Sequence, residues 1–208
     1  MEIKKTGKVA REINMIKFQF VIGKVIIMRG IPGSGKSMMA NLLKNLGAVV
    51  HSTDNYHIEK FRLENGIFHN VFDKIKSIFR ISSSKYKFNG KKIHFYHEVN
   101  YHKFCNSVDE GKKYIVVDNT NFKPSLYKEY VEYAKDNGYE VIAIVFKPSD
   151  ISVHINRNTH NVPLKTLEYM KTTMESNLNT VGVEKQVIIN SEMTLEDIKK
   201  IVDVLLEK

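Results

Sequence analysis

The stretch Val25-Ile26-Ile27-Met28-Arg29-Gly30-Ile31-Pro32-Gly33-Ser34-Gly35-Lys36-Ser37 decides the fold. Its first four residues are apolar, as expected of a strand covered on both faces of a sheet. Residues 30–37 then match the pattern G-x-x-x-x-G-K-[ST] in full. A helix is predicted from Ser37 to Leu46, because Gly47 supplies a natural stop. A strand, this loop and a helix in that order are the context in which the pattern binds phosphate.

Each part of this loop has an expected role toward a nucleoside triphosphate. Glycines let the backbone curl so that successive N–H groups point at phosphate oxygens, and the helix N-terminus adds partial positive charge. We expect Lys36 to contact the β- and γ-phosphates and the Ser37 hydroxyl to bind Mg²⁺. ATP and Mg²⁺ are therefore the expected cofactors. The predicted nucleotide-binding residues are Gly30, Pro32, Gly33, Ser34, Gly35, Lys36, Ser37 and Met38.

Two carboxylates follow predicted strands. Asp118 ends the run Tyr114–Val117, and there it either binds Mg²⁺ or caps a turn. Asp54 follows the run Ala48–Val50, where it either accepts a proton from an attacking hydroxyl or caps a helix. The complete phosphate pattern upstream favours the chemical role for both.

The alternation of β-rich runs with helix-like stretches predicts an α/β fold with three layers and a mainly parallel sheet of about five strands. Further helices are predicted over 126–137, from Pro163 through Met174, and over 195–206 with Thr194 as N-cap. We expect a basic N-terminal extension over residues 1–23 and one domain over 24–208. The predicted strands are Val25–Met28, Ala48–Val50, Tyr114–Val117, Glu140–Phe146 and Gln186–Ile189.

Composition narrows the class of protein. The 208 residues are 42% hydrophobic and 26% charged, which excludes a disordered chain. The longest apolar run, Val141–Phe146, is too short to cross a membrane. One cysteine, Cys105, forms no internal disulfide, which favours a reducing compartment. We expect a cytoplasmic or nuclear location.

The net charge of +9 is concentrated in residues 74–103, which we name the basic segment. Such a segment favours a polyanionic partner, nucleic acid or nucleotide, and a solvated loop is the alternative. Its aromatic residues could stack bases, although helix-spaced aromatics are more often core. The aromatic residues of the basic segment are Tyr86, Phe88, Phe95, Tyr96 and Tyr101.

A cluster of histidines lies within the same segment. These residues share a predicted helix but lack a zinc-binding spacing, so surface or cleft-facing histidines are the better interpretation. The cluster consists of His94, His97 and His102, together with Glu98.

Four motifs in this order carry a resemblance to a known family. After Gly30–Ser37 come Ser52-Thr53-Asp54-x-Tyr56, Val117-Asp118-Asn119-Thr120-Asn121, and Arg157-Asn158-x-His160-x-Val162-Pro163 with Met170 beyond it. Together they resemble the polynucleotide 5′-kinase branch of the P-loop kinases. They resemble more closely the kinase-like P-loop domains of some ubiquitin-ligase-binding proteins. The similarity covers roughly residues 24–178.

The resemblance implies a P-loop NTPase fold with a helical lid, ATP and Mg²⁺ as the phosphoryl donor, and a DNA or RNA 5′-hydroxyl as acceptor. It places Lys36, Asp54 and Arg157 as catalytic residues, with Asp54 as general base and Arg157 as lid arginine. The chain departs from the bacteriophage members of the family at His57, where they have Arg, and near His160 or Asn161, where they have a second lid Arg. A small-molecule kinase and an ATP-binding module that regulates a partner are the alternatives.

Overall fold

A computed structural model describes residues 21–56, 93–190 and 193–206 of the chain. Within them five strands form one sheet in the order β2-β3-β1-β4-β5, and all neighbours are parallel. The α/β fold with a parallel sheet is therefore confirmed, and every predicted strand is present. The strands are β1 (Lys24–Arg29), β2 (Val49–His51), β3 (Tyr114–Asp118), β4 (Glu140–Phe146) and β5 (Lys185–Ile189).

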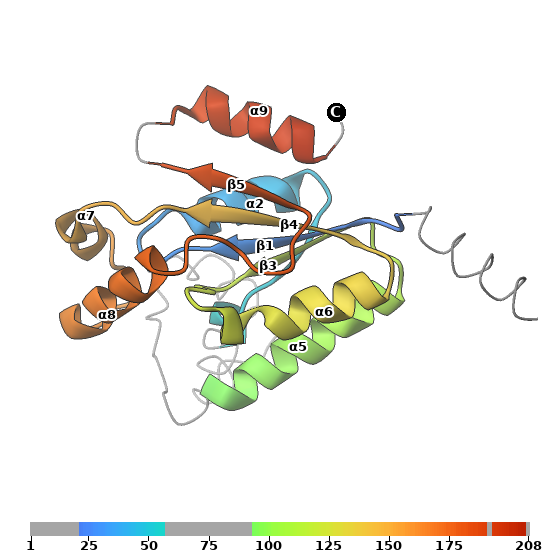
Figure 1. Cartoon of the computed structure of the whole chain (residues 1–208), viewed down its shortest axis with the longest axis horizontal. Helices are drawn as coiled ribbons and strands as arrows, with labels where there is room; N and C mark the ends of the chain where they lie inside the picture. The colour runs from blue at the N-terminus through green and yellow to red at the C-terminus, as the bar shows by residue number, and fades with distance from the viewer. Residues whose placement is uncertain (1–20, 57–92, 191–192, 207–208) are drawn as a thin grey trace, which may run out of the picture.

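Helices cover both faces of the sheet, which gives three layers (Figure 1). Residues on β1 alternate between the faces: Ile26 and Met28 pack with α2 and α9, whereas Val25 and Ile27 pack with α5 and α6. No helix in the described ranges is long and apolar enough to cross a membrane. The helices are α2 (Lys36–Asn45), α5 (Ile93–Asp109), α6 (Lys128–Asp136), α7 (Ile151–Asn156), α8 (Leu164–Glu175) and α9 (Leu195–Leu205).

The helix predicted over 126–137 begins later than expected. A 3₁₀ turn, η3 (Pro124–Leu126), comes first, and α6 starts at Lys128 because Tyr127 leaves the helical conformation at φ −131°. The Tyr127 ring is buried against the guanidinium of Arg29, 4.9 Å from its centroid, and its hydroxyl accepts the Val181 N–H at 3.2 Å. Tertiary packing of one side chain thus overrides local helix propensity.

Helices α7 and α8 lie at the carboxyl edge of the sheet (Figure 1), and the segment that follows α8 is hydrogen-bonded to Arg29. Arg29, the last residue of β1, is fully buried and donates to the carbonyls of Asn121, Asn177 and Leu178 and to Thr180 Oγ1, at 2.6–3.1 Å. These bonds fix the root of the helical lid directly beside the phosphate-binding loop.

The C-terminal helix follows the sequence prediction. Thr194 Oγ1 accepts the Asp197 N–H at 3.2 Å, and the Asp197 carboxylate accepts the Thr194 N–H at 2.9 Å. This reciprocal capping box fixes the start of α9. Val202 and Leu205 then bury the helix against β1 and β4.

Candidate active site

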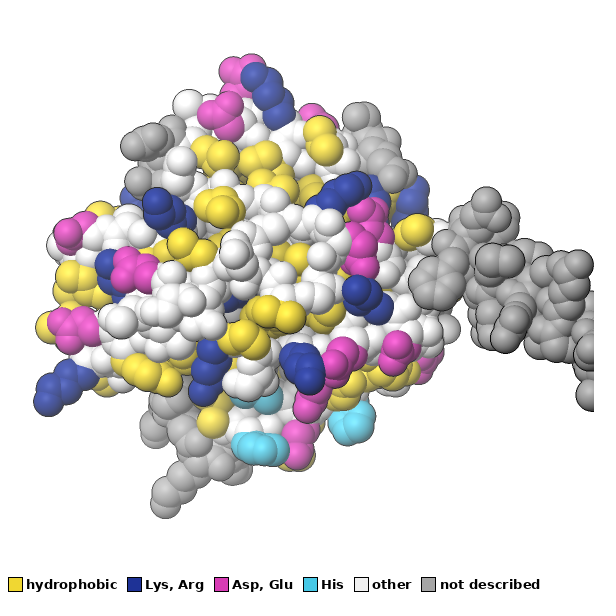
Figure 2. Space-filling model, viewed as in Figure 1, with side chains coloured by type: hydrophobic (Ala, Val, Ile, Leu, Met, Phe, Trp, Pro, Cys, Tyr) yellow, Lys and Arg dark blue, Asp and Glu magenta, His cyan; other side chains and the backbone are white. Residues whose placement is uncertain are grey.

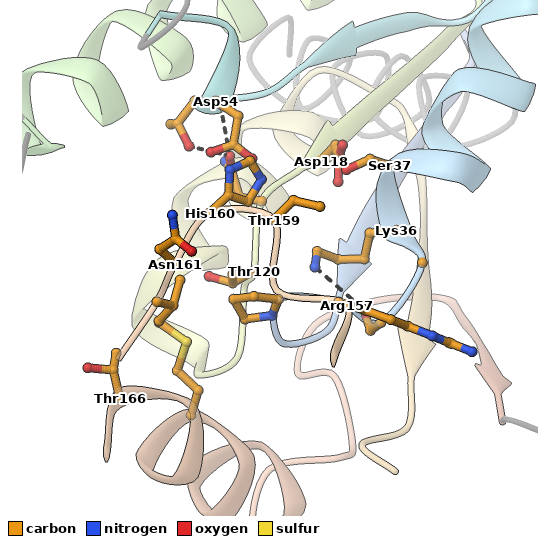
Figure 3. Close-up of a pocket in the computed structure, with 18 of the residues that line it drawn as sticks. Lys36, Ser37, Asp54, Asp118, Thr120, Arg157, Thr159, His160, Asn161 and Thr166 are labelled. Atoms are coloured by element: carbon orange, nitrogen blue, oxygen red, sulfur yellow. Dashed lines mark hydrogen bonds and ion pairs between the residues drawn. The ribbon is translucent and has the colours of Figure 1, made fainter. Parts of the chain in front are cut away.

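A pocket of about 750 Å³ opens at the carboxyl edge of the sheet (Figure 3). It lies where β1, β2 and β3 end, between the end of α7 and the start of α8, the usual place for a ligand in an open parallel sheet. The pocket collects every predicted site residue except Gly30, which directly follows β1. Those residues are Pro32, Gly33, Ser34, Gly35, Lys36, Ser37, Met38, Asp54, Asp118 and Arg157.

The phosphate loop, residues 30–37, requires its glycines. Gly33 and Gly35 have φ values of 76° and 96°, in the left-handed region that favours glycine. A Cβ at Gly30 would approach Ser34 Oγ to 2.6 Å. Gly35 precedes α2 without a capping side chain, so the first N–H groups of the helix are left for an anion.

Lys36 carries the positive charge of the loop. Its ammonium is buried and donates to the Ile31 carbonyl at 3.1 Å. Burial lowers the pKa of Lys36, and the carboxylates of Asp118 and Asp54 oppose this shift. A phosphate group bound at the loop would add negative charge beside this buried cation and stabilise its charged form.

Ser37 and Asp118 lie side by side across the pocket from Asp54 (Figure 3). Burial raises the pKa of Asp118, and nearby Asp54 acts in the same direction, whereas Lys36 and a hydrogen bond with Ser37 oppose the shift. A hydroxyl and a buried carboxylate are oxygen ligands of the kind that Mg²⁺ prefers. The two side chains therefore fit the predicted metal role, and the metal would relieve the burial cost of the carboxylate.

Asp54 lies one strand away from the phosphate-loop strand, because β3 separates β2 from β1. The Asn119 carboxamide oxygen accepts both the N–H and the hydroxyl of Thr53, at 3.1 and 2.9 Å. Asn119 therefore ties the residue before Asp54 to the residue after Asp118. Sequence analysis named Asn119 only as part of the motif that begins at Val117 and gave it no role of its own; its position directly after a predicted metal ligand could have suggested one.

The lid loop, residues 157–163, joins α7 to α8 and brings a second side chain to Asp54. His160 Nε2 lies 3.7 Å from Asp54 Oδ2. Asn158 holds the loop closed, since its side chain accepts the Val162 N–H at 3.1 Å and donates to the Val162 carbonyl at 2.7 Å. Asn161 beside His160 has φ 52°, an uncommon value for a non-glycine residue. His160 thus stands where the sequence resemblance placed a second lid arginine.

Arg157 follows α7 directly and lines the pocket, but its side chain is exposed and points away from Asp54 (Figure 3). His97 and Ile93 bring the start of α5 to the pocket wall, so one of the four residues discussed on this helix faces the cleft, whereas Glu98 is not among the lining residues. The described residues hold no group of three or more potential metal ligands of the His, Cys, Asp and Glu types.

The aromatic residues of the basic segment differ in their burial. Tyr96 is buried, and Tyr101 packs on Phe104 and Tyr130, so both belong to the core and the base-stacking hypothesis is wrong for them. Phe95 is exposed. Tyr86 and Phe88 lie outside the described residues, as do His57 and the cations of the basic segment other than Lys103.

Comparison with known proteins agrees with this architecture. The family model described as "AAA domain" (AAA_33) matches residues 25–176. Human NEDD4-binding protein 2 is 27% identical over 154 residues, which cover 70% of this chain and only 7% of that much longer protein.

Two solved structures share the fold at 16% identity. A gluconokinase from Sinorhizobium meliloti 1021 has a TM-score of 0.53, with 90% of this chain and 94% of that chain covered. A chain of the Pnkp1/Rnl/Hen1 RNA repair complex has a TM-score of 0.52, with 76% of this chain and 46% of that chain covered. Over residues 25–176, from β1 to the end of α8, the chain therefore belongs to the AAA domain family, and it has the fold of a P-loop kinase.

Proposed function

We propose that this domain transfers the terminal phosphoryl group of ATP to a hydroxyl acceptor, and that the acceptor is the 5′-hydroxyl of a nucleic acid. The observation that carries the proposal is the convergence of three sets of groups on one pocket. These are the phosphate loop with Lys36, the Ser37–Asp118 pair, and Asp54 with His160. When bound, ATP supplies the transferable group and Mg²⁺ neutralises its charge.

Asp54 accepts the proton of the attacking hydroxyl. The hydroxyl oxygen forms a bond to the γ-phosphorus, the bond from that phosphorus to the β–γ bridging oxygen breaks, and the electron pair leaves with ADP. Lys36 and the loop amides stabilise the charge on the transferred group. The Arg157 side chain is exposed and now points away from Asp54. It must rotate toward Lys36 before its charge can stabilise the transferred group.

Charge beside Asp54 supports a nucleic-acid acceptor. Lys103, the one cation of the basic segment in the described part of the chain, holds its ammonium 4.7 Å from the centre of the Tyr56 ring. Tyr56 follows Asp54 by two residues and stacks on buried Tyr96. Lys103 and Tyr56 do not line the pocket itself, so the proposed contact of this cation is with a phosphodiester that extends outward from the 5′-hydroxyl at Asp54.

A small polyol is the second candidate acceptor. The described residues near Asp54 include the hydrogen-bonding side chains of Thr53, Asn119 and His160. Acidic and basic side chains of the described residues are also interspersed on the face shown in Figure 2. These features suit a sugar as well as a polynucleotide.

The test is transfer of label from ATP labelled at its terminal phosphate to a panel of acceptors. The panel contains single-stranded DNA and RNA with a 5′-hydroxyl, the same strands with a 5′-phosphate, a nucleoside and gluconate. We expect label only on the strands with a 5′-hydroxyl, and much less of it with the Lys36→Ala variant. Label on the nucleoside or gluconate alone would replace the polynucleotide by a small acceptor. Nucleotide binding without transfer to any acceptor would favour a regulatory ATP-binding module.

A further inference from the structure

His154, on the lid helix α7, contacts the phosphate loop although no motif singled it out. Its side chain is 1% exposed, and its ring bridges two segments. Nδ1 lies 3.0 Å from the Pro32 carbonyl oxygen, and Nε2 lies 3.2 Å from the backbone N of Ser149. His154 therefore joins the loop that binds phosphate to the segment that leads into the lid.

These two partners determine the protonation of the ring. The Ser149 N–H can only donate, so Nε2 must accept, and the single proton of the neutral ring is then on Nδ1. Nδ1–H in turn donates to the Pro32 carbonyl, which can only accept. Burial lowers the pKa of His154, while the bond to Pro32 acts in the opposite direction, and the lowered value agrees with a neutral ring.

The bond to Pro32 constrains the peptide group that follows it. In a trans peptide the carbonyl and the next N–H point in opposite directions. Because His154 holds the Pro32 carbonyl on the α7 side, the Gly33 N–H is directed away from α7. The contact is tight: a Cβ on Gly33 would lie 3.0 Å from the His154 carbonyl oxygen and 3.1 Å from Arg157 Cβ. The backbone of α7 and the root of Arg157 thus pack directly on the loop.

We propose that His154 is a positioning residue for the nucleotide: it turns the Gly33 N–H toward a bound phosphate and holds Arg157 beside the loop. This inference rests on the nucleotide-binding half of the proposed function and is independent of the acceptor. Removing the Nδ1 donor should weaken nucleotide binding, whereas removing the Nε2 acceptor should chiefly loosen the start of α7.

Two substitutions separate the two bonds. In His154→Asn the amide NH₂ replaces Nδ1–H at the same distance along the side chain, whereas His154→Gln places its amide near the position of Nε2. The matched control is His51→Gln, because His51 is also buried and also hydrogen-bonded, to Ser107, but lies outside the pocket lining. The probe is ADP with Mg²⁺, titrated by calorimetry, and thermal melting checks that each variant folds.

We expect His154→Gln to weaken ADP binding about tenfold, because one hydrogen bond that orients the loop is lost. His154→Asn should stay within about threefold of wild type and His51→Gln within about twofold. The inference is overturned if folded His154→Gln binds ADP as tightly as wild type. It is equally overturned if His154→Asn, once folded, loses as much affinity as His154→Gln.

If the variants do not fold, a measurement on the wild-type protein tests whether His154 positions the phosphate loop. Nitrogen NMR of the His154 ring should show the proton on Nδ1, and addition of ADP and Mg²⁺ should shift the Gly33 amide signal. A proton on Nε2, or an unmoved Gly33 signal at saturation, would contradict the inference. A wild-type chain that binds no nucleotide would instead contradict the proposed function itself.

Discussion

The two halves of the pocket are built in different ways. On the nucleotide side, the phosphate loop relies on backbone geometry, with left-handed glycines, a helix N-terminus and a buried lysine. On the acceptor side, Asp54 is 45% exposed and His160 is 34% exposed, and they meet through side chains from two distant segments. A site made of contiguous backbone can bind the phosphates of many different nucleotides. In a site made of side chains from distant segments, a single substitution can change which substrate binds.

The largest effect is expected on the acceptor side. Asp54→Asn keeps the size and capping capacity of the side chain but removes its ability to accept a proton, so phosphoryl transfer should fall by about 10²-fold or more. ADP affinity and melting temperature should hardly change. Rates of transfer measured at saturating ATP and acceptor test this, and a fully active variant would return Asp54 to a structural role.

On the nucleotide side, Lys36→Ala should weaken ATP binding by about 30-fold, because a charge-assisted contact is lost while the loop amides stay in place. The chain should still fold, since the alanine also removes a charge whose burial is unfavourable. Calorimetry with ATP and Mg²⁺ measures the change. Unaltered affinity would show that Lys36 does not contact the phosphates.

Local pattern explains why the nucleotide half could be predicted. The strand, the loop and the start of α2 are contiguous, so the sequence from Val25 to Ser37 contains all of their geometry. Sequence reasoning also predicted each of the five strands. It could not give the strand order β2-β3-β1-β4-β5, which depends on how the α/β units pack and not on any one of them.

The contacts that escaped prediction join residues far apart in the chain. Asn119 is hydrogen-bonded to Thr53, 66 residues earlier in the chain, and Arg29 is hydrogen-bonded to Asn177, 148 residues later. The approach of His160 to Asp54 likewise depends on how the lid loop returns to the end of β2. None of these residue types is distinctive alone, since Asn and His are common in turns and on surfaces. Their mutual contacts therefore become visible only in the assembled fold.

The stability of the protein should depend on pH through the buried side chain of His51, at the end of β2. Burial lowers the pKa of His51 to about 4, and Lys103 adds to the shift. Between pH 6.5 and 4 the unfolded chain therefore binds more protons than the native one, so stability falls as the pH falls through this range. The free energy of unfolding should drop by about 3 kcal/mol on this account.

Urea unfolding of wild type and His51→Gln, each at pH 7 and pH 4, measures this contribution. The variant should lose less stability on acidification than wild type, because it has no ring to protonate at this site. His154 also has a lowered pKa and remains in both proteins, so the difference between them isolates His51. Equal losses in the two proteins would show that His51 is not the group that titrates.

The smallest effect should distinguish a polynucleotide from a small acceptor. Lys103→Glu reverses the charge over Tyr56, two residues beyond Asp54, and should raise the KM of a 5′-hydroxyl oligonucleotide about threefold to tenfold at low salt. Lys113→Glu is the matched control, because Lys113 also lies over a tyrosine ring, that of Tyr114, 5.1 Å from its centre. Tyr114 begins β3, so this pair lies at the amino edge of the sheet, opposite the pocket.

The Lys113→Glu control should leave the KM of the oligonucleotide and the KM of ATP unchanged. Lys103→Glu should also leave the KM of ATP unchanged, since we expect ATP to be held by the loop amides and Lys36. The effect of Lys103→Glu should also shrink as salt is raised, because counterions screen an exposed charge and compete for the phosphodiester. A neutral sugar offers Lys103 no charge to attract, so its KM should be the same for wild type and both variants. If the KM of the oligonucleotide is also the same for all three proteins, the Lys103 charge is solvated surface, and the hydrogen-bonding side chains near Asp54 become the better guide to the acceptor.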